Sequence, residues 1–540
     1  MKKISLIIFC FLILPSQVCL SRNQRLEHEI KRGLRARSIE EVLRLPDDEI
    51  DLATAALIVS EQWSDMVNGR IYLSRLDEMT SEIQKRLDKK WLKPNYKAIP
   101  VINNYLFREL KFKAVPEADN PHALFLNSVL DKKQGYCLSL SILYLSLAER
   151  LGIPIYGVVV PGHFFIRYDD GQTKLNIETT QRGANAPDNY YIDKYKVPTG
   201  NDNSIYMRNL NKIQTLGCLF NNLGNSYNDI NNVENASLVL QRAVKINPTL
   251  SESRANLGNV YLRQGQIDEA INEYLIALEI NPQDAKTHNN LGNAYFRKNR
   301  MQDAISEYAL SLKLDPNYVD AYQNIAVAYS RQEKYGYAIL NLKQAMSLKS
   351  EMPSLHSQLG EVYYLMGDYG AAAFQYKKAI SLKHDFAEAH CGLGLCYNKL
   401  GLVDKEIQAY LQALSIKPNM LAALLSLGNA YFSQKDYDSA IEYYKKALIV
   451  KPDDSWIRYN LGAALFNMGD YEQAVTEYSE ALELNPEMGN AHYGLAVGLY
   501  NLKRYEQAWE HIQIAKKLKM EVPNDLFNDL KNKMRKNNVQ

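Results

Sequence analysis

The sequence predicts an α-rich chain, with a helical N-terminal region and a small α+β core followed by a solenoid of paired helices. Three observations support this fold class. A 34-residue period runs through the C-terminal half, a two-residue hairpin signal lies at Asp170-Gly171, and a Leu- and Ala-rich segment, 138–151, ends at Gly152 and Pro154. The 540 residues are 46% hydrophobic and 23% charged, an ordinary globular composition that suffices for two or three domains.

The first residues have the features of a secretory signal. Two lysines precede an apolar run from Ile4 to Leu14, which is shorter than the roughly 20 residues that a membrane-spanning helix needs. We expect residues 1–21 to be a signal peptide that is cleaved after Ser21, so that the mature protein is exported to the periplasm or secreted. Lipid anchoring at Cys19 is a less favoured alternative, and it is the only route to a membrane that the sequence offers.

Charge and cysteine content exclude several classes of function. The chain has 63 basic and 61 acidic residues, and two of the basic ones lie in the signal, so the mature chain is formally neutral and no nucleic-acid partner is expected. Six cysteines show no disulfide framework, since Cys391 and Cys396 share one predicted helix, and this leaves Cys137 free to react. The nine histidines have no metal-ligand spacing, and we predict no metal and no cofactor.

The predicted organisation has four parts after the signal. Residues 24–200 contain a helical cap and the core, and residues 201–216 form a connector. Residues 217–522 contain the repeats, and residues 523–540 form a charged capping helix that covers the last apolar face.

Candidate catalytic residues lie in the core in the order Cys137, His163 and Glu178. Such a set can make an activated thiol nucleophile. Cys137 begins the predicted helix, where the positive end of the helix dipole favours a thiolate. Taken singly, such a Cys is more typical of a buried small hydrophobe and such a His of a satisfied strand residue, but together they favour a site.

The hairpin signal predicts how His163 and Glu178 meet. If Asp170 and Gly171 form the whole loop, His163 falls directly opposite Glu178, with Cβ atoms roughly 4.5–5.5 Å apart. Alternation places His163, Arg167 and Glu178 on one face and the apolar residues on the other. A longer loop would shift this register by a residue or two.

Three segments of the core resemble a known family. The stretch 132–145 around Cys137, the turn 152–154 and the stretch 161–164 around His163 resemble the bacterial transglutaminase-like core family, in the branch that carries tetratricopeptide repeats. The resemblance extends from about residue 50 to about residue 200 and implies a papain-like α+β fold with a Cys-His-Asp site. Cys137 and His163 match the first two members, and Glu178 stands where the family usually has Asp.

The C-terminal half repeats every 34 residues. Leucine or isoleucine recurs at this spacing, followed each time by Gly or Ala, and proline ends six of the repeats. This pattern predicts nine tetratricopeptide repeats, whose first helices line the inside of the solenoid. The recurring apolar positions are Leu223, Leu257, Leu291, Ile325, Leu359, Leu393, Leu427, Leu461 and Leu495.

One column on the predicted inner face is rich in asparagine. Stacked Asn side chains can donate to and accept from an extended peptide backbone, and such a ladder resembles the peptide groove of O-GlcNAc transferase. Generic repeats also carry Asn at this position, so the column is either a peptide site or a common feature of the repeat. The predicted peptide-binding residues are Asn222, Asn256, Asn290, Asn324 and Asn460.

These observations leave two functions open. The first is an exported cysteine amidohydrolase, peptidase or transglutaminase-like acyltransferase that acts on protein or peptide amide bonds. In such an enzyme Cys137 is the nucleophile, His163 is the general base and acid, and Glu178 orients His163. The solenoid recruits the substrate or a partner protein. The alternative is a non-catalytic interaction scaffold of the cell envelope whose core is degenerate.

Overall fold

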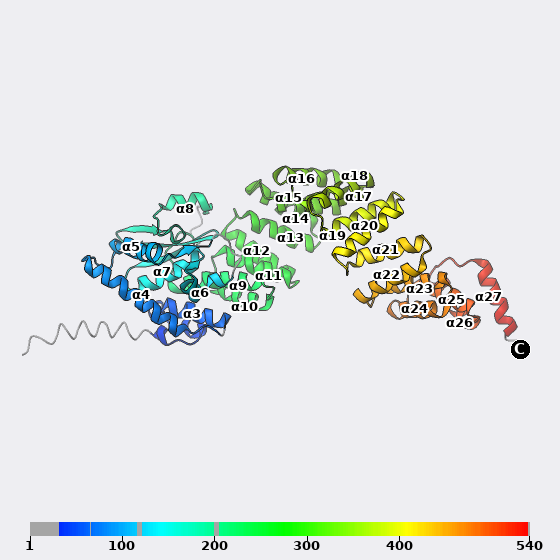
Figure 1. Cartoon of the computed structure of the whole chain (residues 1–540), viewed down its shortest axis with the longest axis horizontal. Coiled ribbons are helices and arrows are strands. Elements are labelled where there is room, and N and C mark those ends of the chain that lie inside the picture. Colours follow the sequence, from blue (N-terminus) through cyan, green and yellow to red (C-terminus); the bar gives the residue numbers. More distant parts are fainter. Residues whose placement is uncertain (1–31, 65, 116–120, 199–204, 538–540) are drawn as a thin grey trace, which may run out of the picture. The chain divides into compact units, whose positions relative to one another are not determined.

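The computed structural model describes residues 32–64, 66–115, 121–198 and 205–537 (Figure 1). The predicted signal segment and Cys19 lie outside the described residues. The chain divides into two compact units, Met1–Pro316 and Asn317–Gln540. This division falls inside the predicted repeats, between α14 and α15.

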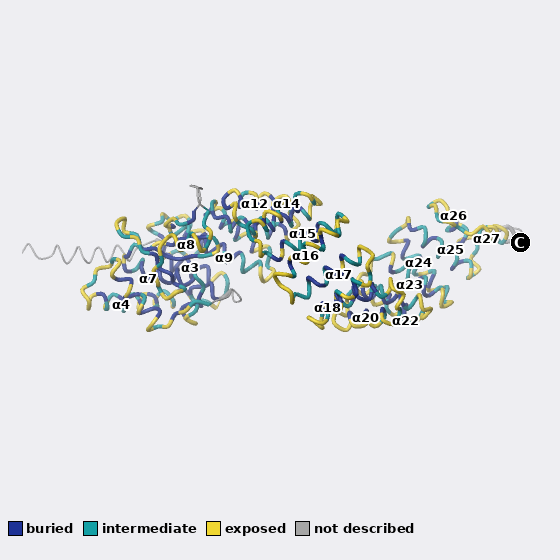
Figure 2. Tube along the Cα trace, turned by 90° about the horizontal axis from the view of Figure 1, so that it is seen from above, coloured by how far each residue is buried: buried dark blue, intermediate teal, exposed yellow. Residues whose placement is uncertain are grey.

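The N-terminal region is helical and buries one side of the core. Its main helices are α3 (Leu52–Trp63) and α4 (Gly69–Lys89), and Asp51 caps α3 by accepting a 2.7 Å hydrogen bond from the Thr54 N–H group. Figure 2 shows dense burial around α3 and α7. The remaining elements before the core are η1 (Arg32–Arg35), α2 (Ile39–Val42), η2 (Asp47–Glu49), η3 (Tyr96–Ala98), α5 (Ile99–Asn103), the π-helical turn η4 (Asn104–Glu109), β1 (Lys113–Ala114), η5 (Pro121–Leu124), α6 (Leu126–Lys132) and β2 (Gln134–Gly135).

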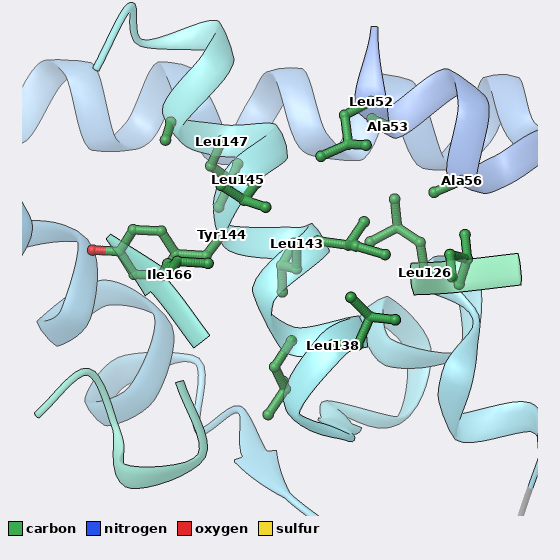
Figure 3. Close-up of a cluster of buried hydrophobic side chains, with 14 of the residues drawn as sticks. Leu52, Ala53, Ala56, Leu126, Leu138, Leu143, Tyr144, Leu145, Leu147 and Ile166 are labelled. Atoms are coloured by element: carbon green, nitrogen blue, oxygen red, sulfur yellow. The ribbon is translucent and has the colours of Figure 1, made fainter. Parts of the chain in front are cut away.

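The core is built around helix α7 (Cys137–Arg150), which contacts α3, α4 and α6 and also the strands β3 and β4. Figure 3 shows its apolar side chains meeting those of α3, including Leu143 and Leu52. Gly152, with φ of 68°, begins the turn from α7 into the sheet. Strands β3 (Ile155–Val160), β4 (His163–Asp169) and β5 (Lys174–Ile177) form an antiparallel sheet in that order.

The predicted hairpin register is wrong by two residues. Ile166 pairs with Ile177 and Asp169 with Lys174, so the loop is four residues long rather than two. The Asp170 carboxylate stabilises this longer loop by accepting hydrogen bonds from the N–H groups of Gln172 and Thr173, at 3.0 and 2.7 Å. A shift of two residues keeps every side chain on its predicted face, because side chains alternate with a period of two.

One further helix lies between the sheet and the repeats. Helix α8 (Asp188–Tyr195) covers the face of the sheet that carries His163, and the buried Tyr191 ring stacks on Phe165 with centroids 3.9 Å apart. The 3-10 turn η6 (Thr179–Gln181) precedes it. Helix α9 begins at Lys212, inside the connector predicted for residues 201–216, because Asn211 and Gln214 cap each other's backbone N–H groups.

Helix pairs follow from α9 onward. In the first unit they are α9 (Lys212–Asp229), α10 (Val233–Ile246), α11 (Ser251–Arg263), α12 (Ile267–Ile280), α13 (Ala285–Arg297) and α14 (Met301–Leu314). In the second unit they are α15 (Val319–Arg331), α16 (Tyr335–Leu348), α17 (Pro353–Met366), α18 (Tyr369–Leu382), α19 (Ala387–Lys399), α20 (Val403–Ile416), α21 (Leu421–Ser433), α22 (Tyr437–Val450), α23 (Ser455–Met468), α24 (Tyr471–Leu484), α25 (Gly489–Asn501) and α26 (Tyr505–Lys517), followed by α27 (Asn524–Asn537). Among the described helices, none is long and apolar enough to cross a membrane.

The recurring glycine of the repeats allows a tyrosine of the second helix to pack against the first. A Cβ atom added at Gly394 would lie 2.4 Å from Cε1 of Tyr410, whose side chain is buried. The same contact joins Gly292 to Tyr308 and Gly428 to Tyr444. The small residue that recurs after each leucine therefore sets how closely the two helices of a repeat approach.

We expect Gly394→Ala to destabilise the second unit by about 1–3 kcal/mol, because the added methyl group overlaps a buried ring that has no room to move. The matched control is Gly370→Ala, at an exposed helical position where the nearest side-chain atom lies 3.7 Å from the added Cβ. Urea denaturation followed by circular dichroism measures both variants. Equal transition midpoints for the two variants would contradict this packing.

Candidate active site

The fold places Cys137 at the first turn of α7, on the wall of a cleft. The helix starts there because Ser139 Oγ accepts a 2.9 Å hydrogen bond from the Tyr136 N–H group and donates a 2.7 Å bond to the Ala123 carbonyl. The Thr179 hydroxyl donates to the Cys137 carbonyl at 3.3 Å. The last of these bonds joins the start of α7 to the residue that directly follows Glu178.

His163 is the first residue of β4, after a turn in which Gly162 has φ of 71°. Its Nε2 atom lies 2.7 Å from Oε2 of Glu178. The other carboxylate oxygen of Glu178 accepts hydrogen bonds from the N–H group and the hydroxyl of Thr180, at 3.1 and 2.5 Å. Glu178 is only 2% exposed, so its orientation toward His163 is fixed.

The contact between His163 and Glu178 predicted from sequence is present, although the two residues are not a cross-strand pair. Strand β5 ends at Ile177, and Glu178 stands at the start of η6. Its N–H group donates to the Ala184 carbonyl at 2.8 Å instead of to β4. The longer side chain of Glu, compared with Asp, reaches the imidazole from this position.

Electrostatics favour a charged imidazole. Burial by itself would lower the pKa of His163, but interaction with Cys137 and Glu178 raises this pKa to about 9. Burial alone would raise the pKa of Glu178, yet the hydrogen bond and charge of His163 lower it below its ordinary value. The raised pKa favours the imidazolium form of His163, whose Nε2 faces Glu178 and whose ring also has a hydrogen bond with Cys137.

Tyr195 of α8 forms part of the same site. Its ring stacks on the His163 imidazole with centroids 4.7 Å apart and planes 2° from parallel. Tyr195 also lines the cleft, whereas Tyr191 is fully buried and packs on the sheet. The stacked ring shields His163 from water, which strengthens its interaction with Glu178.

The cleft has a volume of about 600 Å³, and the first repeats line much of it. Cys137 and His163 line this cleft, and so do the predicted peptide-binding residues Asn222, Asn256 and Asn290. All five belong to the same compact unit. The structure therefore brings the two predicted sites together in a single cleft.

The remaining two residues of the asparagine column, Asn324 and Asn460, belong to the second unit. The column is also less uniform there, since Gly392 and Gly494 stand at two of its positions. Only Asn222, Asn256 and Asn290 of the predicted peptide-binding residues therefore lie in the unit that contains the cleft.

Several residues of the cleft escaped prediction. Glu252 of α11 lines the cleft, and its Oε1 accepts a 3.1 Å hydrogen bond from the N–H group of Gly162, next to His163. Nothing in the repeat pattern marks this residue. Asn225 and Asn259 form a second amide column that could have been found, because both recur with the same 34-residue spacing.

Among the described residues, no group of three or more His, Cys, Asp or Glu side chains could hold a metal ion. Cys218, Cys391 and Cys396 are free but buried, and Cys137 is free and half-buried. Cys137 is thus the most accessible thiol of the part of the chain that the structure describes.

Comparison with known families supports both parts of the chain. Residues 70–216 match the model of the transglutaminase-like superfamily. Models of the tetratricopeptide repeat match residues 224–265, 258–299, 292–333, 360–401, 387–420, 428–469 and 455–488.

Individual relatives cover only parts of the chain. A UPF0162 protein of Xylella fastidiosa is 31% identical over 123 residues, which are 22% of this chain and 43% of that protein. F-box only protein 21 of Mus musculus is 36% identical over 74 residues, 14% of this chain and 12% of that protein. The crystal structure of MamA is 32% identical and covers 30% of this chain and 95% of that chain, with a TM-score of 0.28.

The chain spans less than half the length of these curated relatives, so their activities are not transferred to it. The family models, the α7–sheet core and the helix pairs agree with one another on domain identity. This protein consists of a transglutaminase-like core domain followed by multiple tetratricopeptide repeats.

Proposed function

We propose that the core is a thiol enzyme that acts on amide bonds of a protein or peptide, with Cys137 as nucleophile, His163 as general acid and base, and Glu178 as the group that orients His163. The observation that carries this proposal is the buried 2.7 Å contact between His163 and Glu178 in the same cleft as a free cysteine. A structural histidine does not need a buried, fully bonded carboxylate beside an accessible thiol.

In the first half of the reaction, the Cys137 thiolate attacks the amide carbonyl carbon and a C–S bond forms. The first-turn N–H groups of a helix lack intrahelical partners, and those at the start of α7 are assigned to the developing oxyanion. His163 donates its proton to the amide nitrogen as the C–N bond breaks. A thioester and a free amine, or ammonia, result.

In the second half, water or an amine attacks the thioester while the neutral His163 accepts its proton. The C–S bond breaks, the Cys137 thiolate is restored, and a carboxylic acid or a new amide leaves. Glu178 stabilises the imidazolium in both halves. The proposal covers hydrolysis and acyl transfer alike, because the nucleophile of the second half is not built into the protein.

The repeats bind a protein or peptide in general, as arrays of this kind do. We propose that this partner is the substrate or a protein that presents it. The alternative function, a non-catalytic scaffold, requires that Cys137 be unreactive, and the following measurement separates the two.

Cys137 is expected to react with iodoacetamide rapidly near pH 6 in the folded protein, and His163→Ala should slow this reaction by tenfold or more. The reason is that the imidazolium stabilises the thiolate, whereas an ordinary thiol reacts only as the pH approaches about 8.5. Mass spectrometry locates and quantifies the label at each pH.

Cys391 is the internal control, because burial raises the pKa of its thiol to about 11 and it should stay unlabelled until the protein unfolds. Should Cys137 label only on unfolding, or only near pH 8.5 without any effect of His163→Ala, the thiol-enzyme proposal fails. The scaffold function would then stand.

Replacing Glu178 by Gln should lower the pKa of His163 from about 9 toward its ordinary value of 6.5, because a carboxylate that stabilises the imidazolium is lost. A raised folded-state pKa stabilises the fold fully below pH 6.5, and this contribution is lost as the pH rises through 9. Glu178→Gln should therefore lower the free energy of unfolding at pH 6 more than at pH 10. Imidazole NMR and urea titration measure the two effects, and an unchanged His163 titration would refute the pairing.

We also propose that the protein is exported, on the strength of the apolar run from Ile4 to Leu14 behind two lysines. Expression of the full chain in a bacterial host with a Sec pathway, followed by N-terminal sequencing, should give Arg22 as the first residue of a periplasmic or secreted product. Recovery of the uncut chain in the cytoplasm would contradict export, and a lipid-modified Cys19 would show the anchored alternative.

A further inference from the structure

We propose that the catalytic cleft and the first three repeats form one binding site for an extended polypeptide, in which Asn222, Asn256 and Asn290 bind the main chain and place the reacting amide at Cys137. This inference rests on the proposed thiol chemistry and names its substrate class. It assigns the first repeats to the active site itself, rather than to recruitment of a partner at a distance.

The geometry of the cleft is the first argument. Its lining includes Cys137 and His163, Leu250 and Glu252 of the first two repeats, and the asparagines of α9, α11 and α13, whose side-chain amides form what we call the amide wall. The volume of about 600 Å³ lies within the 300–1,000 Å³ that ligand pockets typically have. A substrate that fills this cleft therefore contacts both the thiol and the amide wall.

The second argument is that this wall is held in a fixed position. Glu252 of α11 accepts hydrogen bonds from the Gly162 N–H group at 3.1 Å and from the Tyr206 hydroxyl at 2.6 Å. At the base of α9, Lys212 Nζ lies 2.5 Å from a carboxylate oxygen of Glu149 on α7. The repeats are thereby joined to the turn that carries His163 and to the helix that carries Cys137.

The third argument is the bonding state of the asparagines. Asn256 donates to Asn221 at 3.0 Å and Asn290 donates to Asn259 at 2.9 Å, so one amide hydrogen of each is used within the wall. A side-chain amide has two hydrogens and an acceptor oxygen, which leaves further donors and acceptors for a ligand. Among the described residues, Asn225 has no side-chain partner at all, and Asn222 only accepts a long 3.4 Å bond from Asn221.

A polypeptide in extended conformation fits this set of groups. Half-buried amides need partners that both donate and accept, and each peptide group offers one N–H and one C=O. In a helix these groups already bond to one another, so only an extended segment can offer them to the wall. Main-chain recognition of this kind tolerates many side chains, as in peptides that bind along a sheet edge.

The test compares two probes with the same reactive group. The first is chloroacetamide, whose labelling rate depends only on the reactivity of Cys137. The second is a pool of mixed-sequence nonapeptides with a chloroacetyl group on a central diaminopropionate side chain. The labelling rate of these peptides also depends on their binding in the cleft. Rates of Cys137 labelling are measured by mass spectrometry on the full-length protein.

We expect the peptide pool to label Cys137 at least tenfold faster than chloroacetamide does. The triple variant Asn222→Ala, Asn256→Ala, Asn290→Ala should lose this advantage while its chloroacetamide rate stays within about twofold of the wild type. Asn467→Ala, an exposed asparagine of α23 outside the column, is the matched control and should keep the wild-type ratio. Asn222→Ala alone, which removes only a long contact within the wall, should lower the ratio even if the triple variant proves unstable.

Other outcomes overturn the inference without touching the thiol chemistry. If chloroacetamide labels folded Cys137 but the peptides show no advantage, or the advantage survives in the Asn222→Ala variant, the asparagines do not bind substrate. If a chloroacetylated amino sugar reacts faster than the peptides and depends on the same asparagines, the ligand is a saccharide. If chloroacetamide itself fails to label Cys137 in the folded protein, the proposed thiol function is contradicted, and so is the inference that rests on it.

Discussion

The packing of α9 against the core is the constraint on which the rest of the first unit depends. Leu216, Leu219 and Phe220 belong to the same buried cluster as the side chains of α3 and α7. Packed against this cluster, the Tyr227 and Trp63 rings lie with their centroids 4.7 Å apart. Because α9 is both the first repeat helix and a structural element of the core, the array begins at the cleft that contains Cys137.

A buried His–Glu pair is the second organising feature, and it shows how Glu178 reaches His163 from outside the sheet. Glu178 leaves the sheet one residue after β5 ends, and Thr180 bonds the carboxylate oxygen that does not face His163. Each group lowers the cost of burying the other, since a buried charge without a partner is expensive. The pair therefore contributes to the stability of the fold as well as to the proposed chemistry.

The repeats serve two different purposes along their length. In both units, small residues and buried tyrosines keep the helices of a pair close, as Gly292 and Tyr308 do in the first unit and Gly394 and Tyr410 in the second. On the inner face, the first unit carries asparagines in two columns, while leucine, glutamate and glycine replace several of them in the second unit, as at Gly392 and Glu361. The packing positions thus follow the period, and the surface positions differ between the two units.

The sequence by itself determined the solenoid, the helix after Cys137 and the faces of the hairpin, because all of these follow from local periodicity and motif spacing. It did not determine the loop length at Asp170, helix α8 or the start of α9, since these depend on side-chain bonds that compete with the simplest turn. Only the tertiary structure decided that Asn222, Asn256 and Asn290 share a cleft with Cys137. The physical reason is that α9 is placed by the packing of its apolar surface against the core. The residues that make this contact are far apart in the sequence, so no local pattern predicts it.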